Sequence, residues 1–389
     1  MHEGLKALLS LAPSAPHWAI DWAEAERSAC APWFARMKEV PQEKKWHGEG
    51  DVWTHTKLVC QALAQMEEYR ALERGTQETV FLAVLLHDVG KIVTTRTEDG
   101  EIRAPKHGEI GSRMVRTMLW TEMGLCGSAE AQQLRETVCR LIRWHMAPLH
   151  MLEGDGEHRL RRIAAESELL GGFSIRLLCL LAEADNRGRI CDDLAEQLDK
   201  IELCRELARE HGCMDGPSAF ACGHTQRAYF DGRNVLPDQP LYDDTWGEVI
   251  LLCALPGTGK DTWIAANCPQ LPMVSLDDMR DEMGVLPTDN QGAVAQACKE
   301  SARRRLRAKE PFVFNATNLT PLTREPLVRL FEQYGARVRI VYLETEWQEE
   351  MRRNAARRKA VPEGVIHAML EKLAVPERAE ARTVEWICV

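Results

Sequence analysis

The spacing of apolar residues changes once along this chain, and that change limits the folds that the chain can adopt. From about residue 28 to 211, apolar residues recur at intervals of three and four, as at Val138, Leu141 and Ile142. Such spacing is typical of helices that bury one face. From Glu248 onward, short apolar runs alternate with stretches of helical spacing; the runs are VILLCAL, MVSL, FVFN and VRIVYL. Strands that alternate with helices favour a parallel sheet with crossover helices.

We therefore expect a two-domain protein. The first domain is all-α, a helical bundle assigned to residues 1–211 with a core from about 28 to 211. Residues 212–246 are rich in glycine, proline and aspartate, which break helical spacing and are typical of a connector. Residues 247–389 are expected to form an α/β domain with a parallel sheet. A chain of 389 residues is long enough for two domains that each bury a core of their own.

The composition is that of a globular protein, with 45% hydrophobic and 28% charged residues. No apolar run approaches the ~20 residues that cross a bilayer, and the first residues lack the features of a signal peptide. We therefore expect no membrane association and a cytoplasmic location. The 13 cysteines are scattered without a Cys-x-x-Cys pair, which favours reduced thiols over a disulfide framework or a zinc ribbon.

The formal net charge of −10 argues, at first sight, against a nucleic-acid partner. The charge is unevenly distributed, however. Between Lys299 and Lys359 there are 15 Lys and Arg against 8 Asp and Glu, a local charge of +7. A short single-stranded end requires only a local basic groove, so the net charge predicts weak, salt-sensitive binding to long duplexes rather than the absence of a nucleic-acid substrate.

A glycine-rich loop follows the first strand-like run of the second domain. The segment Ala254–Thr262, with the sequence ALPGTGKDT, lies between VILLC and the helix-like TWIAANC, which is the context of a phosphate-binding P-loop. Gly257 and Gly259 would let backbone N–H groups close around phosphate oxygens, and Lys260 would reach the β- and γ-phosphates.

Two positions of this loop depart from the usual pattern. Ala254 stands where a glycine is usual, and Asp261 stands where a Ser or Thr normally binds Mg²⁺. A carboxylate is also a hard oxygen ligand, so metal binding by Asp261 is plausible. We expect ATP or another NTP, with Mg²⁺, as the bound nucleotide, and its predicted contacts are Gly257, Thr258, Gly259, Lys260, Asp261 and Thr262.

The next strand-like run ends in residues that could serve a phosphate acceptor. Asp277 and Arg280 follow the run MVSL, and ligands of parallel sheets lie beyond the C-terminal ends of the strands. Asp277 could accept the proton of an attacking hydroxyl, and Arg280 could hold an anionic part of the acceptor. On the pattern alone, a helix N-cap explains Asp277 equally well. Residues Glu346–Lys359 are expected to form a basic helix that neutralises developing phosphoryl charge.

Four spaced motifs in this region, PGTGK, SLDDMR, NATN and RNAARRKAVP, resemble those of the polynucleotide 5′-kinases. The resemblance implies that Lys260 binds phosphate, that Asp277 is the general base and that Arg280 clamps the acceptor's 3′-phosphate. It also implies that Arg353 and Arg357, four residues apart on one face of the expected helix, act as lid arginines. The sequence departs from the family at Ala316, where a relative carries an aspartate that supports the acceptor arginine.

Histidines and aspartates on well-separated segments of the first domain suggest a metal centre. Sequence-distant ligands of this kind suit a site inside a helical bundle, and imidazole with carboxylate suits Mn, Fe, Co, Ni or Zn. A carboxylate between two imidazole clusters can bridge two ions. The candidate ligands are His55, His87, Asp88, His107, His145 and Asp185.

The segments that carry these residues, DVWTHT, LLHDVGK, KHGEIGS, RWHM and EADNRGR, resemble in that order the ligand motifs of the HD-domain metal phosphohydrolases. The resemblance implies two transition-metal ions. His55, His87, Asp88 and Asp185 would bind the first ion, and His107 and His145 the second, with Asp88 as the bridge. It also implies that Lys91 contacts a phosphate oxygen.

An HD phosphohydrolase followed by a polynucleotide-type kinase resembles the bacterial HD-Pnk end-healing proteins. That resemblance implies removal of 2′,3′-cyclic, 2′- or 3′-phosphates by the first domain and 5′-OH phosphorylation by the second. The implied partners are single-stranded RNA or DNA ends and, functionally, a ligase. Two alternatives stay open: a small-molecule or nucleoside kinase fused to a nucleotidase, and an ATP-sensing module that regulates an HD phosphohydrolase.

Overall fold

The computed structural model describes residues 2–286, 289–357 and 359–389. Its Cα positions cluster into an N-terminal unit, Met1–Leu125 with Glu130–Ser218, and a C-terminal unit, Cys126–Ala129 with Ala219–Val389. The segment 212–246, expected as a connector, divides between these units and contains helix α13 (Gly223–Phe230).

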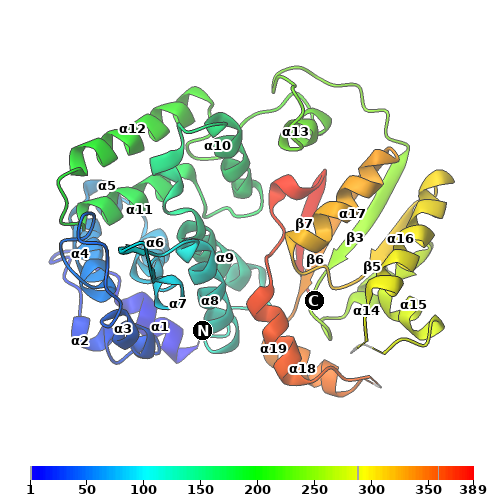
Figure 1. Ribbon diagram of the computed structural model, residues 1–389, viewed down its shortest axis with the longest axis horizontal. Helices are drawn as coiled ribbons and strands as arrows, with labels where there is room; N and C mark the ends of the chain where they lie inside the picture. Colours follow the sequence, from blue (N-terminus) through cyan, green and yellow to red (C-terminus); the bar gives the residue numbers. More distant parts are fainter. Residues whose placement is uncertain (1, 287–288, 358) are drawn as a thin grey trace. The chain divides into compact units, whose positions relative to one another are not determined.

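The N-terminal unit is built from helices, as its apolar spacing predicts (Figure 1). Its elements are α1 (Glu3–Ser10), α2 (Trp22–Ala25), α3 (Ala31–Met37), α4 (Val52–Gln65), α5 (Glu67–Arg70), α6 (Arg74–Leu86), α7 (Lys91–Thr94), α8 (His107–Thr121), α9 (Ala129–Trp144), η1 (Ala147–His150), α10 (Gly156–Ala164), η2 (Ala165–Glu168), α11 (Ile175–Arg187) and α12 (Leu194–Glu210).

Helix α6 forms the centre of this unit. Every side chain from Val80 to Leu86 is buried, and the helix packs against α4 and α11. A helix that is apolar on all sides is stable only when other helices surround it. The chain therefore carries His87 and Asp88, which follow α6 directly, into the interior of the unit.

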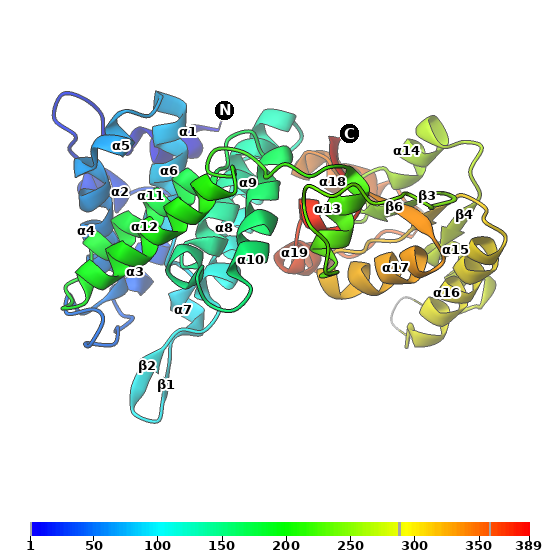
Figure 2. The ribbon, with the colours of Figure 1, turned by 90° about the horizontal axis from the view of Figure 1, so that it is seen from above.

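The N-terminal unit also contains a short hairpin that the apolar spacing did not predict. Strands β1 (Arg96–Glu98) and β2 (Glu101–Arg103) pair antiparallel and project from the helices (Figure 2). The turn residues Asp99 and Gly100 have φ values of 52° and 82°. Asp-Gly is a favoured pair for a two-residue hairpin turn that requires positive φ at both positions.

The C-terminal unit holds a five-stranded parallel sheet with the order β4-β5-β3-β6-β7. The strands are β3 (Gly247–Cys253), β4 (Met273–Ser275), β5 (Phe312–Asn315), β6 (Ala336–Glu344) and β7 (Thr383–Cys388). The first four correspond to the apolar runs of the sequence. The edge strand β7 was not expected, because only Val384 among its residues is fully buried and its sequence, TVEWIC, is a weak apolar run.

Helices cover both faces of this sheet. On one face, Trp263 and Ile264 of α14 pack on residues of β3 and β6; on the other, Phe331 of α17 contacts Phe312 and Phe314 of β5. The remaining helices of the unit are α13, α14 (Lys260–Asn267), α15 (Leu276–Glu282), α16 (Gly292–Arg307), α17 (Pro321–Gln333), α18 (Trp347–Ala355), α19 (Glu363–Lys372) and η3 (Arg378–Glu380).

The parallel register brings the C-terminal ends of the strands to one edge. Leu251 of β3 is level with Phe314 of β5 and with Ile340 of β6, so the loops that follow these strands lie side by side. No helix within the described ranges is both long enough and apolar enough to cross a membrane.

Candidate metal centre and phosphate-binding site

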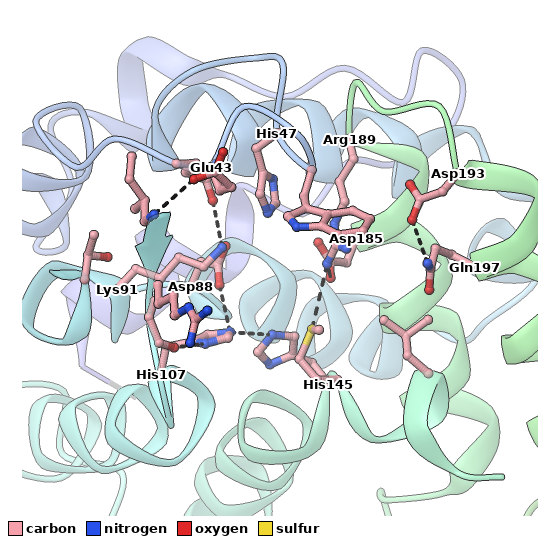
Figure 3. A pocket seen from close by; sticks show the side chains of 18 of the residues that line it. Glu43, His47, Asp88, Lys91, His107, His145, Asp185, Arg189, Asp193 and Gln197 are labelled. Carbon is pink, nitrogen blue, oxygen red and sulfur yellow. Dashed lines mark hydrogen bonds and ion pairs between the residues drawn. The ribbon is translucent and has the colours of Figure 1, made fainter. Parts of the chain in front are cut away.

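The structure brings all six predicted metal ligands together inside the N-terminal unit. They come from α4, the end of α6, the start of α8, the residue after α9, and α11. Figure 3 shows four of them, Asp88, His107, His145 and Asp185, around one cavity. In chain order the six are His55, His87, Asp88, His107, His145 and Asp185, and all except the partly exposed His107 are buried.

Asp88 lies at the centre of this cluster. Its Oδ2 atom is 3.3 Å from Nε2 of His87, and its Oδ1 atom is 3.4 Å from Nε2 of His107. On the Oδ2 side, Nε2 of His55 lies 3.7 Å from Asp88 and 3.0 Å from Oδ1 of Asp185. One carboxylate therefore faces imidazoles on both sides, an arrangement that can bridge two cations.

Backbone carbonyls orient three of the imidazoles. The Nδ1 atoms of His87, His107 and His145 each donate to the carbonyl three residues earlier, at 2.7, 2.8 and 2.7 Å respectively. Because Nδ1 carries the proton in each ring, Nε2 presents its lone pair to the cluster. The Nε2 atoms of His107 and His145 lie 3.1 Å apart, so two lone pairs face each other where a cation would satisfy both.

The unsatisfied atoms of the cluster fit divalent metal ions. Nε2 of His87 and Oδ1 of Asp88 are buried and make no hydrogen bond within the described residues, which is costly unless another group binds them. Imidazole nitrogen and carboxylate oxygen are common ligands of transition metals. Five of the predicted ligands fall into two overlapping sets of closely spaced donor groups, His55–His87–Asp88 and Asp88–His107–His145, and a third set, His47–Glu49–His55, shares His55 with the first.

Glu49 contacts the ring nitrogen of His55 that does not face the cluster, a contact that the sequence did not reveal. Its Oε1 atom is 2.7 Å from Nδ1 of His55 and 2.8 Å from Nδ1 of His47. Its Oε2 atom accepts the backbone N–H of Ile190 at 3.1 Å. A carboxylate behind a ligating imidazole fixes the orientation of the ring and raises its basicity. Glu49 lies two residues before the segment DVWTHT, and its contacts depend on a residue far along the chain.

Two basic side chains neutralise the buried aspartates. Nζ of Lys91 is 2.7 Å from Oδ2 of Asp88, and Nη2 of Arg189 donates to Oδ2 of Asp185 at 2.6 Å. Burial alone raises the pKa of the Asp88 carboxyl, but the ammonium charge of Lys91 opposes burial and helps to hold that pKa well below its usual range. Arg189 does the same for the pKa of Asp185. Both aspartates are therefore ionised and able to bind metal.

A cavity of about 360 Å³ opens onto the cluster. Its walls carry several cations and one large aromatic side chain: Lys91, Arg103, Arg189, Lys200 and Trp46. The indole of Trp46 is 41% exposed. The cavity thus combines metal ligands, positive charge and an accessible aromatic surface.

The glycine-rich loop of the C-terminal unit has the conformation that phosphate binding requires. Gly257 and Gly259 have φ values of 91° and 108°, and a Cβ atom at Gly257 would lie 2.9 Å from the backbone oxygen of Glu350. Only glycine fits there without strain. Nζ of Lys260 donates to the carbonyl of Leu255 at 3.0 Å, and burial lowers the pKa of Lys260. The phosphate oxygens of a bound nucleotide can replace that carbonyl as the hydrogen-bond acceptor of Lys260.

The other predicted nucleotide contacts differ in exposure. Thr258 is buried, and its hydroxyl donates to the carbonyl of Leu255 at 3.0 Å. Asp261 and Thr262 lie exposed in the first turn of α14. Nδ2 of Asn315, the last residue of β5, donates to Oδ1 of Asp261 at 2.8 Å.

The acceptor side of this site is centred on Asp277. Ser275, not Asp277, is the N-cap of α15, because its hydroxyl accepts the N–H of Asp278 at 3.2 Å. The N-cap explanation of Asp277 is therefore wrong. The Asp277 carboxylate is 68% exposed and pairs with Nη1 of Arg280, and its Oδ2 atom is 3.8 Å from Nη2 of Arg357.

A side chain outside the recognised motifs supports Arg280. Its Nε donates to Oε1 of Gln291 at 2.8 Å. Ala316 stands where the resemblance led us to look for an aspartate, and Gln291 with Asp277 holds the guanidinium here. Nothing in the sequence around Gln291 marked it for this contact.

The lid helix is shorter than the sequence predicted. Helix α18 ends at Ala355 rather than at Lys359, so Arg357 lies beyond it and does not share a helical face with Arg353. The expected helix overran because alanines and arginines continue past the observed end. Arg353 nevertheless reaches the phosphate loop, since its Nη1 donates to the carbonyl of Thr258 at 2.9 Å.

Comparisons with known proteins agree with this architecture. Residues 52–187 match the family model of the HD domain, and residues 249–376 match a family model described as an AAA domain. Among solved structures, a gluconokinase from Sinorhizobium meliloti 1021 is similar at 24% identity, over 36% of this chain and 82% of that chain, with a TM-score of 0.27. The search of curated proteins gave no match.

The chain thus joins a helical HD domain to an α/β P-loop domain of the kinase-like type. An HD domain with this His and Asp cluster implies bound divalent metal ions, and a P-loop domain of this type implies a nucleotide with Mg²⁺. These two types of domain suggest hydrolase and kinase chemistry.

Proposed function

We propose that the protein is a bifunctional nucleic-acid end-healing enzyme. The HD domain removes 2′,3′-cyclic, 2′- or 3′-phosphates from the ends of single-stranded RNA or DNA, and the P-loop domain transfers the γ-phosphate of ATP or another NTP to 5′-OH ends. The products, a 3′-OH and a 5′-phosphate, are the ends that a ligase joins, so a ligase is the proposed functional partner. The cytoplasm is the proposed location.

The exposed position of Asp277 is the observation that carries this proposal. Its carboxylate is 68% exposed and has guanidinium groups on both sides, from Arg280 and Arg357. An open carboxylate can be approached by the end of a long chain, whereas a small acceptor is usually enclosed by its site. The flanking guanidiniums suit the phosphates that follow a terminal nucleotide.

In the kinase reaction, each side chain has a defined task. Lys260 and the backbone N–H groups of the loop hold the β- and γ-phosphates. Asp277 takes the proton of the 5′-hydroxyl as it attacks, and Arg280 binds the acceptor phosphate. Arg353 and Arg357 stabilise the charge of the transferring group.

In the hydrolase reaction, the chain binds and orients the phosphate end. The six clustered ligands would hold the metal ions, which supply Lewis acidity and a water of lowered pKa. Lys91 and Arg189 face the cavity beside the cluster and neutralise the phosphate oxygens. Trp46 offers an exposed indole in the same cavity, and a nucleobase can stack on such a surface.

The proposal is tested with two variants and a matrix of substrates and metals. Asp277→Asn removes the proposed base, and His87→Ala removes a metal ligand. Oligonucleotides with 5′-OH, 3′-phosphate or 2′,3′-cyclic phosphate ends are compared with free nucleosides and nucleotides. We expect Asp277→Asn to lose 5′-kinase activity and keep the hydrolase, and His87→Ala to do the reverse.

The controls separate this proposal from its alternatives. Asp278→Asn changes the neighbouring carboxylate of the same helix and is expected to keep kinase activity. A preference for free nucleosides and nucleotides would indicate a small-molecule enzyme, and the absence of γ-phosphate transfer to any acceptor would indicate an ATP sensor. Loss of both activities in either variant would contradict the division of labour.

A further inference from the structure

We propose that Asp261 and Asn315 form the Mg²⁺-binding pair of the kinase site. Compared with the usual P-loop site, the carboxylate and its neutral partner have exchanged places between the loop and the strand. The inference rests on the proposed kinase function. In most P-loop NTPases, a Ser or Thr hydroxyl after the loop lysine binds Mg²⁺, and an Asp on a nearby strand completes the site. Here the carboxylate, Asp261, is on the loop, and the neutral side chain, Asn315, is on the strand.

The sheet places these two residues next to each other. Strand β5 pairs directly with β3, which leads into the phosphate loop, and Asn315 is the last residue of β5. Its side chain is 7% exposed. Asp261 follows Lys260 at the start of α14. The strand end and the loop therefore meet at the edge of the sheet where the phosphates of a nucleotide bind.

The hydrogen bond between the two side chains has the reverse direction of the usual one. Asn315 Nδ2 donates to Asp261 Oδ1 at 2.8 Å, whereas a loop hydroxyl would donate to a strand carboxylate. This bond uses one carboxylate oxygen and one amide hydrogen. The second oxygen of Asp261 and the amide oxygen of Asn315 are hard oxygen atoms, the type of ligand that Mg²⁺ prefers.

The exchange preserves the charge of the pair. A hydroxyl with an aspartate carries one negative charge, and so does an aspartate with an asparagine. Mg²⁺ therefore meets the same net charge beside Lys260 in both arrangements. Two carboxylates at these positions would repel each other, and two neutral side chains would leave the cation without a charged ligand.

A reciprocal exchange of the two residues tests this inference. Asp261→Ser removes the loop carboxylate, Asn315→Asp adds a strand carboxylate, and the double variant restores the usual hydroxyl and aspartate. The full-length protein is titrated with a non-hydrolysable ATP analogue, with and without Mg²⁺, by calorimetry. Mn²⁺ binding is followed by its electron paramagnetic resonance signal, and only the binding that requires the analogue is counted, which excludes ions held by the HD cluster.

We expect Asp261→Ser to weaken the nucleotide-dependent Mn²⁺ binding by at least about tenfold. Analogue binding without metal stays within about twofold, because Lys260 and the loop backbone remain. Asn315→Asp alone also weakens metal binding, and the double variant recovers most of the affinity. The matched control is Asp278→Asn, which removes an exposed carboxylate of α15 that has no role in the proposed site, and it is expected to leave metal binding unchanged.

Each contrary result has a defined meaning. Retention of metal binding in Asp261→Ser, its loss in Asp278→Asn, or a double variant no better than the single ones would overturn the inference. Failure of the wild-type protein to bind the analogue at all would instead contradict the proposed kinase function. Circular dichroism melting curves identify any variant that fails to fold.

Discussion

The two candidate sites of this protein are built in opposite ways. In the HD domain, His55, His87 and Asp88 are each at most 1% exposed. A backbone carbonyl orients the imidazole of His87, and the carboxylate of Glu49 lies beside Nδ1 of His55. In the P-loop domain, the central carboxylate, Asp277, is 68% exposed and is paired with side chains from a helix and a loop. One site is buried and the other is open.

This difference indicates that the side chains of the two sites lose conformational freedom at different stages, those of the metal site on folding and those of the kinase site on substrate binding. The helices that bury the metal ligands hold them in place before any ion binds, so metal binding requires little rearrangement. The exposed ion pairs of the kinase site contribute little to stability, and their partners can be exchanged for substrate phosphates. We therefore expect the HD site to respond sharply to small changes in its ligands, and the kinase site to be ordered by its substrates.

The largest expected effect comes from Asp88→Asn, which removes the central charge of the buried cluster. We expect phosphohydrolase activity and bound metal to fall by more than about 100-fold, because Asp88 is the donor shared by both sets of imidazoles. Metal content measured by mass spectrometry checks this directly. Asp193→Asn is the control, since Asp193 lines the same cavity but bonds to Gln197. Equal losses in both variants would show that metal binding depends on the negative charge of the cavity and not on coordination by Asp88.

A smaller effect is expected from Glu49→Gln. The amide can still accept the Ile190 N–H, but it no longer attracts the proton on Nδ1 of His55. The metal affinity is expected to fall by about 10- to 100-fold, as for other carboxylates behind ligating imidazoles. Competition with a chelator of known affinity measures it. Glu43→Gln, a carboxylate of the same cavity that binds the N–H of Ile102, is expected to change the metal affinity little.

The sequence predicted which residues lie together in the first cluster, because that information is local. Each ligand lies in a short segment with recognisable neighbours. Glu49 was missed because its role depends on His55 and Ile190, which meet it only after folding. Glu49 also lies just outside the motif DVWTHT, which begins at Asp51.

The second site was predicted less completely, for a physical reason. The loop, Asp277 and Arg280 follow apolar strands and could be placed at the sheet edge. The end of α18 at Ala355 and the support of Arg280 by Gln291 depend on tertiary contacts, which override local helix propensity. The edge strand β7 has little apolar signal, because one of its sides has no neighbouring strand.

The aromatic wall of the HD cavity gives the next prediction. Trp46→Ala is expected to raise the KM for phosphorylated oligonucleotide ends by about tenfold, because a stacked base contributes about 1–3 kcal/mol. Trp46→Phe keeps an aromatic face and is expected to retain most of the affinity. An oligonucleotide with an abasic terminal residue should not distinguish the two variants from the wild type. An equal rise in KM on the abasic substrate would show that Trp46 stabilises the fold and does not stack on the terminal base.

A buried carboxylate of the P-loop domain, Glu350, behaves in the opposite way to Asp88, and its expected effect is on stability rather than on catalysis. Burial raises the pKa of Glu350 to about 8, because the charge of Lys260 only partly offsets the loss of water. In the unfolded chain Glu350 has a pKa near 4.5. Between these values the folded protein holds a proton that the unfolded chain has lost, so stability falls as the pH rises from about 4.5 to about 8.

Glu350→Gln cannot ionise and removes this dependence. Relative to the wild type, the variant is expected to gain about 1 kcal/mol of stability per pH unit across that window. Unfolding midpoints in urea at pH 5, 6.5 and 8 measure the difference, in which the titration of all other groups cancels. A constant difference between Glu350→Gln and the wild type across these pH values would mean that Glu350 is ionised in the folded protein, and that the P-loop domain tolerates a buried charge as the metal cluster does.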